Sequence, residues 1–243
     1  MSIFDPASVK VLAFDVFGTV VDWHGSIAAE VDALDLGVPG AAFAQAWRDR
    51  YQPSMHKVRS GELPWTRIDD LHRMNLDEVI EATGVVLDEA GRRALNLVWH
   101  RLDPWPDSAT GLRRLRQRYR LATMSNGNLG LLADLSRHGD LRWDLILSAE
   151  VFRHYKPDPE TYLGVCEVFD IAPSEMLMVA AHKDDLRAAA RCGCRTAFIE
   201  RPTEFGAGVP VDVSKSADLD VHARDLEHLA ELLGCPPCPQ PES

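Results

Sequence analysis

The sequence predicts an α/β fold in which a doubly wound, Rossmann-like parallel sheet forms the core and an all-helical cap domain is inserted into it. From residue 107 onward, helical stretches alternate with short apolar strands, as in repeated βα units. Another apolar run, Val9 to Phe14, stands near the N-terminus, and no convincing strand pattern occurs between residues 22 and 104. Because one strand cannot bury both of its faces alone, strand 9–14 must join the later sheet, which makes the helical segment an insertion.

The inserted segment has helical periodicity throughout. Helices are expected at residues 27–36, 41–51, 68–74, 76–82 and 90–102, with Gly61, Pro64 and Gly84 as breaks. The pattern predicts a discontinuous core domain of residues 1–21 and 105–243 and a cap domain of residues 22–104.

The second half of the chain repeats one unit, a helix followed by a strand. The expected helices are 108–118, 128–138, 159–169 and 184–192, and the expected strands are 120–124, 145–148, 176–180 and 196–200. A last helix, 223–233, precedes a Pro-rich tail, and residues 235–243 are expected to be poorly ordered.

Charge limits the classes of partner. The formal net charge is −11 at 243 residues, so an acidic surface would repel nucleic acid and anionic membranes, and a small anionic substrate would need its own Arg or Lys. No apolar stretch approaches the roughly 20 residues that span a bilayer, and the N-terminus lacks the features of a signal peptide. We therefore expect a soluble, cytoplasmic protein.

The five cysteines do not predict a disulfide framework or a metal site. Their number is odd, which fits reduced thiols. Cys235 and Cys238 have CxxC spacing, but no second Cys or His pair lies near them to complete four ligands. No metal and no cofactor is expected.

Polar residues follow four of the expected strands. Asp15 follows the first strand, Ser125 and Asn126 follow the second, Lys156 lies beyond the third, and Asp184 and Asp185 follow the fourth. Carboxyl ends of parallel strands share one edge of the sheet, where ligands bind in such folds. Taken alone, Asp15 could simply cap the next turn, but the four groups together predict a common site.

These groups carry a family resemblance that covers nearly the whole chain. The segments Asp-Val-Phe-Gly-Thr (15–19), Met-Ser-Asn-Gly (124–127), Tyr-Lys-Pro-Asp (155–158) and Asp-Asp (184–185) occur in the order typical of the haloacid dehalogenase superfamily. Within it, the chain most resembles the L-2-haloacid dehalogenases, including fluoroacetate-dehalogenating members. The resemblance implies Asp15 as nucleophile, Asp185 as the residue that helps to activate water, and Lys156 as the cation that neutralises both.

Phe17 discriminates between chemistries. Phosphatases of the superfamily carry Asp two residues after the nucleophile, because an alkoxide leaving group needs a proton and the same stretch helps to hold Mg²⁺. Phe17 can do neither, whereas a halide other than fluoride departs without a general acid. The alternatives are a Mg²⁺-dependent phosphatase of small molecules and a catalytically silent binding protein.

The resemblance implies roles for further residues. Thr19 and Ser125 offer hydroxyl donors, Asn126 offers an amide for the departing halide, and Arg48 matches the cap arginine that holds carboxylate or halide. An apolar pocket for the substrate is expected to include Phe17, Trp47 and Trp105. Tyr162 also matches a family position and is expected to contact the substrate. The alternatives are turn residues for Ser125 and Asn126, a surface helix arginine for Arg48, and core packing for the aromatic side chains.

The sequence departs from the family at residues 180–185. Ala180 replaces a hydroxyl and His182 replaces an amide, so the support of Asp185 is altered. His182 could bond to Asp15, to Asp185 or to the attacking water, and as a cation it could assist a poor leaving group such as fluoride; a structural histidine is the alternative.

The expected activity is metal-free hydrolysis of short 2-haloalkanoic acids to 2-hydroxy acids through an aspartyl ester, with inversion. A haloacid is then the partner and halide a product. The preferred halogen, chain length and enantiomer stay open, as does a homodimer, which is common among related enzymes.

Overall fold

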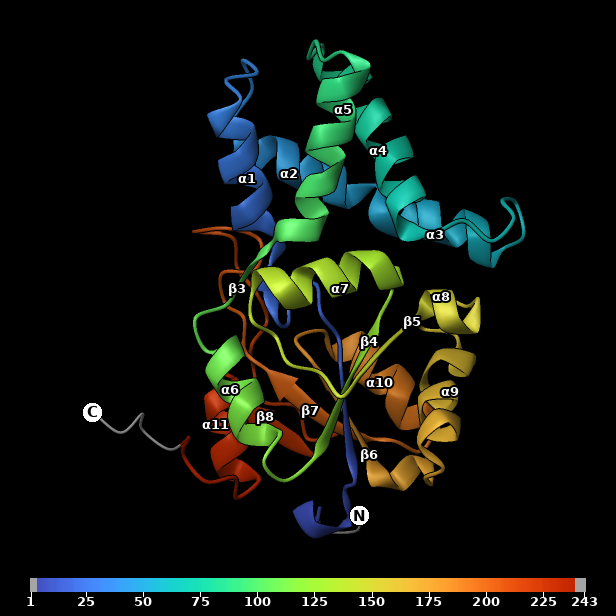
Figure 1. Ribbon diagram of the computed structural model, residues 1–243, viewed down its shortest axis with the longest axis vertical. Coiled ribbons are helices and arrows are strands. Elements are labelled where there is room, and N and C mark those ends of the chain that lie inside the picture. Colours follow the sequence, from blue (N-terminus) through green and yellow to red (C-terminus); the bar gives the residue numbers. More distant parts are fainter. Residues whose placement is uncertain (1–3, 239–243) are drawn as a thin grey trace.

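The computed structural model describes residues 4–238 and has a six-stranded sheet. A group of helices lies above this sheet (Figure 1). Neighbouring strands are all parallel, in the order β5-β4-β1-β6-β7-β8. The strands are β1 Val11–Phe14, β4 Arg120–Ser125, β5 Leu145–Ser148, β6 Met176–Ala180, β7 Arg195–Ile199 and β8 Val221–Ala223. The predicted α/β fold is confirmed.

Strand β1 lies inside the sheet and is fully buried. Its last residue, Phe14, pairs with Thr123 of β4 on one side and with Val179 of β6 on the other. Chain order runs outward from β1 in both directions, so β1 stands at the topological switch point where ligands bind in open α/β sheets. The register therefore brings the residues that follow β1, β4 and β6 to one edge.

Helices cover both faces of the sheet. The side chains of β1 alternate, with Leu12 and Phe14 in one core cluster and Val11 and Ala13 in the other. The first face is covered by α6 Ser108–Leu115, α7 Leu129–His138 and α11 Leu226–Leu232, and the second by α9 Pro159–Phe169 and α10 Lys183–Arg191 (Figure 1). The short helices η1 Pro6–Ser8, α8 Ala149–Phe152 and η3 Pro173–Glu175 complete this part.

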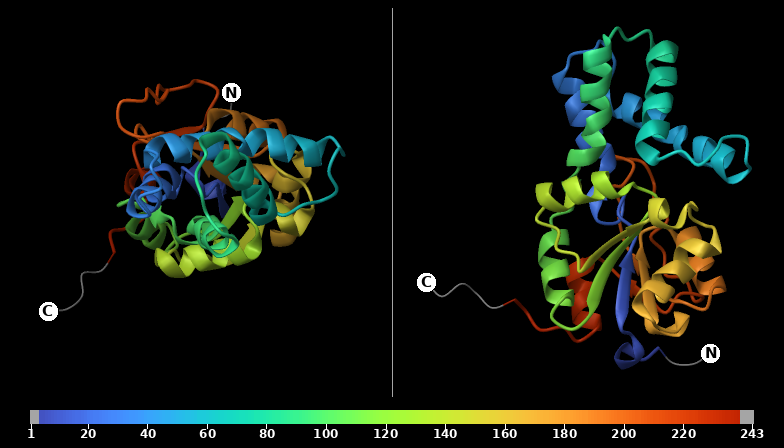
Figure 2. Two further views of the ribbon diagram at one scale, coloured as in Figure 1. Left: turned by 90° about the horizontal axis from the view of Figure 1, so that it is seen from above. Right: turned by 45° about the vertical axis from the view of Figure 1, so that its right-hand side comes forward.

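The remaining helices lie beyond the carboxyl edge of the sheet (Figure 2). They are α1 Trp23–Ala33, α2 Gly40–Asp49, α3 Tyr51–Arg59, α4 Ile68–Thr83, α5 Glu89–Asn96 and the 3-10 helix η2 Leu97–Arg101. The chain enters through β2 Val21–Asp22 and returns through β3 Asp103–Pro104, which pair antiparallel. The apolar core of the first sheet face continues into these helices, so their inner side closes over the end of β1.

Several predicted elements differ from the observed ones. The two helices expected at 68–74 and 76–82 form one helix, α4, because Asn75 is buried and its amide donates to Ser54 Oγ (3.1 Å) instead of breaking the turn. The helix expected at 90–102 is divided between α5 and η2. Ala223 belongs to β8, and the last helix starts after Asp225, whose side chain accepts a hydrogen bond from the His228 amide (2.6 Å).

The start of the predicted tail is held by the core. Cys235 is buried, and Arg114 donates to the carbonyl oxygens of Cys235 (3.2 Å) and Pro236 (3.3 Å). The first residues of the predicted tail therefore pack against the core, and residues 239–243 lie outside the described part of the chain. Between residues 4 and 238, no helix is long and apolar enough to cross a bilayer.

Candidate active site

A cavity of about 530 Å³ lies where the carboxyl edge of the sheet meets the inserted helices. The core domain contributes Asp15, Phe17, Asn126, Lys156, Pro157, His182, Asp184 and Asp185 to its lining, and the helices contribute Arg48, Tyr51, Gln52 and Arg59. Of the polar groups predicted to meet at this edge, all but Ser125 belong to the described lining of the cavity.

Asp15 is the most tightly coordinated of these side chains and is only 6% exposed. Its Oδ1 accepts a hydrogen bond from Lys156 Nζ (2.8 Å). Its Oδ2 accepts from Thr19 Oγ1 (2.7 Å) and faces His182 Nδ1 (3.1 Å). Burial raises the pKa of Asp15, but the charge of Lys156 and the contact with His182 outweigh it and hold the pKa well below its ordinary value. Asp15 is thus an ionised, oriented carboxylate.

Lys156 joins two carboxylates. Its Nζ lies 2.8 Å from Asp15 Oδ1 and 2.5 Å from Asp185 Oδ2, and its backbone amide donates to Asn126 Oδ1 (2.8 Å). Burial lowers the pKa of Lys156, but the charges of Asp15 and Asp185 raise it well above its usual range. Asn126 therefore positions the backbone of Lys156, whose ammonium lies between the two acids.

The donor set does not fit a divalent metal. Among the described residues, no three His, Cys, Asp or Glu side chains form a cluster that could hold one. Mg²⁺ requires several oxygen ligands, whereas the turn after Asp15 supplies the hydrocarbon ring of Phe17, and the ammonium of Lys156 already bridges Asp15 and Asp185.

Asp185 is held from behind by Tyr162. The Tyr162 hydroxyl donates to Asp185 Oδ1 at 2.5 Å. The ring lies in the core on the α9 face of the sheet, and Tyr162 is not among the described residues that line the cavity. Burial and the charge of Asp185 raise the pKa of Tyr162, so the phenol stays a donor. Its position is that of a residue that orients Asp185, which differs from the expected contact with substrate.

The guanidinium of Arg48 lies at the cavity, against two aromatic rings. Its guanidinium carbon lies 4.1 Å from the centre of the Tyr51 ring and 5.2 Å from that of Trp23. Its Nη1 is buried and has no hydrogen-bond partner within residues 4–238. Because a buried N–H group without a partner is costly, an anion in the cavity is the expected acceptor.

Phe17 forms the floor between the cavity and the aromatic interior. Its ring centre lies 5.5 Å from that of Trp99 and 6.5 Å from that of Tyr51, both in edge-on contacts. Phe17 presents an apolar ring to the cavity that Asp15 also lines. Phe17 is therefore part of the packed core as well as of the cavity lining.

Trp47 and Trp105 differ from expectation, since neither belongs to the described lining. Trp47 donates to the His72 carbonyl (2.9 Å) inside the helical domain, and Trp105 donates to the Gly18 carbonyl (2.9 Å). These backbone hydrogen bonds turn both indoles away from the cavity.

The two expected hydroxyl donors, Ser125 and Thr19, form hydrogen bonds inside the protein. Ser125 Oγ accepts a hydrogen bond from the Gly127 amide (3.1 Å) and shapes the turn after β4. Thr19 Oγ1 accepts from the Ala181 amide (2.9 Å) and donates to Asp15, so it orients the carboxylate from outside the lining.

Sequence reasoning missed Glu204, which completes the site behind His182. Glu204 is 1% exposed, and its Oε1 lies 2.9 Å from His182 Nε2. Burial lowers the pKa of His182, but Glu204 and Asp15 raise it to about 10. Both ring nitrogens are engaged, which leaves no ring N–H for a departing fluoride. No motif marks Glu204, since an acid in a loop after a strand usually faces solvent.

The chain is similar to known dehalogenases over most of its length. The family described as haloacid dehalogenase-like hydrolase matches residues 9–193. A solved L-2-haloacid dehalogenase is 43% identical with a TM-score of 0.89, covering 93% of this chain and 99% of the other. A solved defluorinating L-2-haloacid dehalogenase is 40% identical with a TM-score of 0.89, covering 93% and 96%. An (S)-2-haloacid dehalogenase of Pseudomonas sp. (strain CBS-3) is 28% identical over 81% of this chain and 88% of its own.

Proposed function

Because the chain belongs to the haloacid dehalogenase-like hydrolase family, we propose that it hydrolyses the carbon–halogen bond of short 2-haloalkanoic acids and yields 2-hydroxy acids. One observation carries the proposal: Asp15 is buried, ionised and paired with Lys156, while the turn that follows it supplies Phe17 and no acid. A nucleophile without a neighbouring general acid suits a leaving group that needs no proton.

Arg48 would bind the substrate carboxylate. The aromatic rings of Tyr51 and Trp23 hold the guanidinium at the cavity, and its Nη1 has no partner among the described residues. A planar carboxylate can accept two hydrogen bonds from such a guanidinium. The same charge would draw a small anion into a protein of net charge −11.

In the first step, Asp15 Oδ1 attacks the halogen-bearing carbon from the side opposite the halide. Oδ1 accepts one hydrogen bond and Oδ2 faces two donors, so Oδ1 has the freer lone pair. The new bond joins Oδ1 to carbon, the carbon–halogen bond breaks, and the halide leaves with its electron pair. The substrate carbon is inverted, because later steps do not touch it.

In the second step, water attacks Cγ of the Asp15 ester and gives a proton to Asp185. The Cγ–Oδ1 bond then breaks, and the departing oxygen takes a proton from Lys156, which lies 2.8 Å from Oδ1 and recovers one from Asp185 at 2.5 Å. The 2-hydroxy acid keeps Oδ1, and Asp15 keeps the water oxygen. The sum is one haloacid and one water converted to one hydroxy acid, one halide and one proton.

Halide release tests the proposal. Wild-type protein is incubated with chloro-, bromo- and fluoro-carboxylates in EDTA, beside Asp15→Asn and the control Asp49→Asn, an exposed acid that bonds Gln45. We expect release by wild type and by the control, and a loss of at least about 1,000-fold in Asp15→Asn. Absence of release from every haloacid, or phosphate-ester hydrolysis that requires Mg²⁺, would overturn the proposal.

A further inference from the structure

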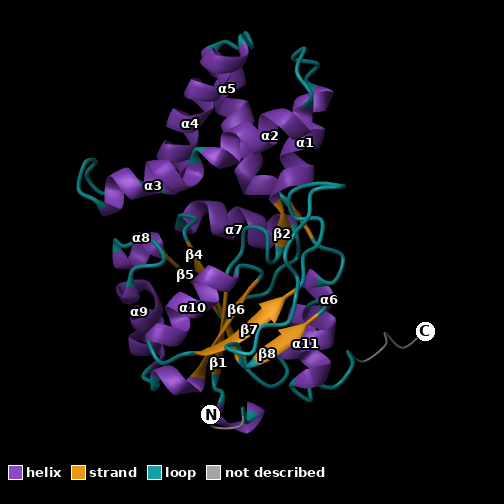
Figure 3. Cartoon of the chain, turned by 180° about the vertical axis from the view of Figure 1, so that it is seen from behind, coloured by secondary structure: helices purple, strands orange, loops and turns teal. Residues whose placement is uncertain are grey.

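The reaction above leaves one buried carboxylate without a task. Glu204 is 1% exposed and lies in the loop after β7, which rises to the base of the cap helices (Figure 3). Burying a carboxylate is costly unless its oxygens are paired, so its partners are informative. Oε1 accepts from Trp23 Nε1 (3.1 Å) and lies 2.9 Å from His182 Nε2.

The loop that carries Glu204 is hydrogen-bonded to the turn that follows Asp15. Arg201 donates to the Thr19 carbonyl (2.9 Å) and forms two bonds with Asp107 (2.8 and 2.7 Å). Gly18 has a φ of +83°, and a Cβ at that position would lie 2.2 Å from Glu204 Oε1. The absence of a side chain at Gly18 therefore creates the space that Glu204 fills.

The two contacts of His182 define its protonation. Nδ1 faces Asp15 Oδ2 (3.1 Å) and Nε2 faces Glu204 Oε1 (2.9 Å). An ionised carboxylate only accepts hydrogen bonds, so a ring between two of them must donate from both nitrogens. A neutral imidazole has one N–H and would leave one contact unmade. The arrangement thus requires an imidazolium.

We propose that Glu204 is a positioning residue that keeps His182 an imidazolium against Asp15 Oδ2, where His182 and the Thr19 hydroxyl form the oxyanion site for hydrolysis of the aspartyl ester. This inference depends on the function proposed above. It assigns His182 to the second step, in place of the assistance to fluoride departure that the sequence suggested.

The geometry agrees with the course of the reaction. Once Oδ1 is bonded to the substrate, Oδ2 is the carbonyl oxygen of the ester, and it carries the negative charge when water adds to Cγ. Thr19 Oγ1 and His182 Nδ1 already lie 2.7 and 3.1 Å from Oδ2. Donors that are in place before charge develops lower the barrier without further reorganisation.

Glu204 is needed because esterification removes the charge of Asp15. In the free enzyme, two carboxylates hold the proton on His182; in the ester, Asp15 is neutral and Glu204 is the carboxylate that remains in contact. Without it, the imidazole would tend to lose its second proton at the moment when the oxyanion forms. Neutral glutamine at this position keeps the shape but not the charge.

The experiment separates the two steps. Wild type and Glu204→Gln are mixed rapidly with excess chloroacetate, and chloride is followed together with the mass of the acid-quenched protein. In Glu204→Gln we expect chloride equal to about one per active site at nearly the wild-type rate, then turnover reduced about 10- to 100-fold. The quenched variant should carry the ester on Asp15.

Two further variants make the result specific. Glu200→Gln alters another Glu–His pair, in which Glu200 Oε1 lies 2.6 Å from His222 Nε2, and it should behave as wild type. His182→Asn removes the imidazolium and should accumulate the same ester. Because His182 is only half-buried, this variant tests the inference even if Glu204→Gln does not fold.

Each remaining outcome contradicts the inference. Unchanged turnover in a folded Glu204→Gln, unchanged turnover in His182→Asn, or an equal slowing of the chloride burst would show that Glu204 does not act on ester hydrolysis through His182. If wild type releases no halide at all, the proposed function fails first, and the inference fails with it.

Discussion

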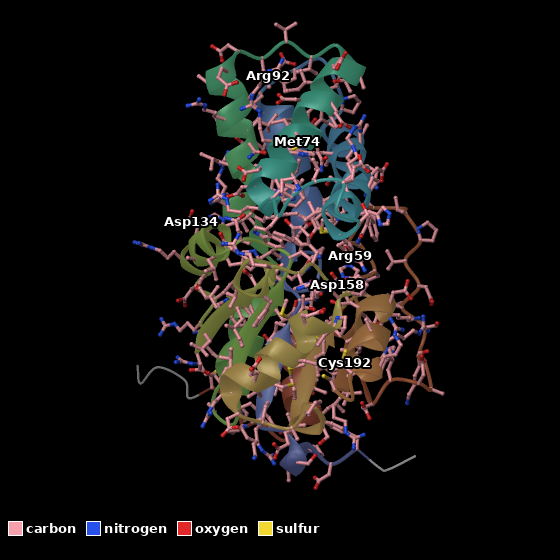
Figure 4. All side chains as sticks on the ribbon, turned by 90° about the vertical axis from the view of Figure 1, so that its right-hand side faces the viewer. Arg59, Met74, Arg92, Asp134, Asp158 and Cys192 are labelled. Atoms are coloured by element: carbon pink, nitrogen blue, oxygen red, sulfur yellow. The ribbon has the colours of Figure 1, made fainter. Side chains whose placement is uncertain are left out.

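Arg59 binds Asp158 across the boundary between the cap helices and the core (Figure 4). Arg59 Nη2 lies 2.7 Å from Asp158 Oδ1, and Nε donates to the same oxygen at 2.8 Å. Arg59 ends α3 and lines the cavity, while Asp158 precedes α9 and follows the segment of Lys156. This ion pair therefore ties the end of α3 to the loop that carries Lys156.

Breaking this pair should weaken substrate binding more than stability. The pair is partly exposed, so we expect Asp158→Asn to lower the free energy of unfolding by no more than about 1 kcal/mol. A freer cap should raise KM for chloroacetate about 2- to 5-fold at low salt, and the difference should shrink at about 0.5 M salt, which screens the pair. The control is Asp70→Asn, whose partner Arg67 lies within the cap. Equal KM values at low salt would contradict the role.

Arg48 should determine the affinity for the substrate carboxylate. Loss of a charge-assisted hydrogen bond costs about 1.5–3 kcal/mol, so Arg48→Gln should raise KM for chloroacetate about 10- to 100-fold. Arg50→Gln is the matched control, because Arg50 directly follows the helix of Arg48 and its Nε pairs with Glu78 Oε2 (3.2 Å). Steady-state kinetics of both variants give the comparison, and similar KM values in the two would exclude Arg48 as the anion site.

Gly18→Ala should impair both stability and turnover. A positive φ costs a residue with a Cβ about 1 kcal/mol, and here the Cβ would also displace Glu204. Gly37→Ala is the control, since Gly37 has a φ of +74° and nothing described lies within 4 Å of its Cβ position. In urea unfolding, we expect the control to lose only the free energy that a positive φ costs a residue with a Cβ, about 1 kcal/mol. Its turnover should equal that of wild type. Equal effects in the two variants would argue against close contact at Gly18.

The contacts of His182 should stabilise the fold in a defined pH range. Burial lowers the pKa of His182, but Glu204 and Asp15 raise it from 6.5 to about 10 in the folded state. A raised pKa gives stability that is fully present below about pH 6.5 and is lost as pH rises through 10. The difference in free energy of unfolding between wild type and His182→Asn should therefore be largest near pH 6 and shrink toward pH 10.5. Urea unfolding across this range measures it, and a pH-independent difference would contradict the assignment.

Much of the fold and part of the site follow from local patterns. Strand β1 is an apolar run that ends at Asp15, and parallel strands bring the residues after their carboxyl ends to one edge. Strand and helix periodicity therefore predicts Asp15, Lys156 and Asp185 at one edge, although it predicts two helices in place of α4 and no strand at β8. The order of the motifs indicated the family.

The remaining features depend on which side chains meet after the chain has folded. Trp23 and Glu204 are 181 residues apart and share a hydrogen bond, and no pattern in the sequence connects them. Trp47 and Tyr162 have the residue types expected of a binding pocket, yet their polar atoms bond to His72 and Asp185 inside the protein. Local sequence specifies the direction of a strand or a helix face, whereas the partner of a buried polar group is set by packing between distant segments, because such a group must find an acceptor or donor wherever the fold provides one.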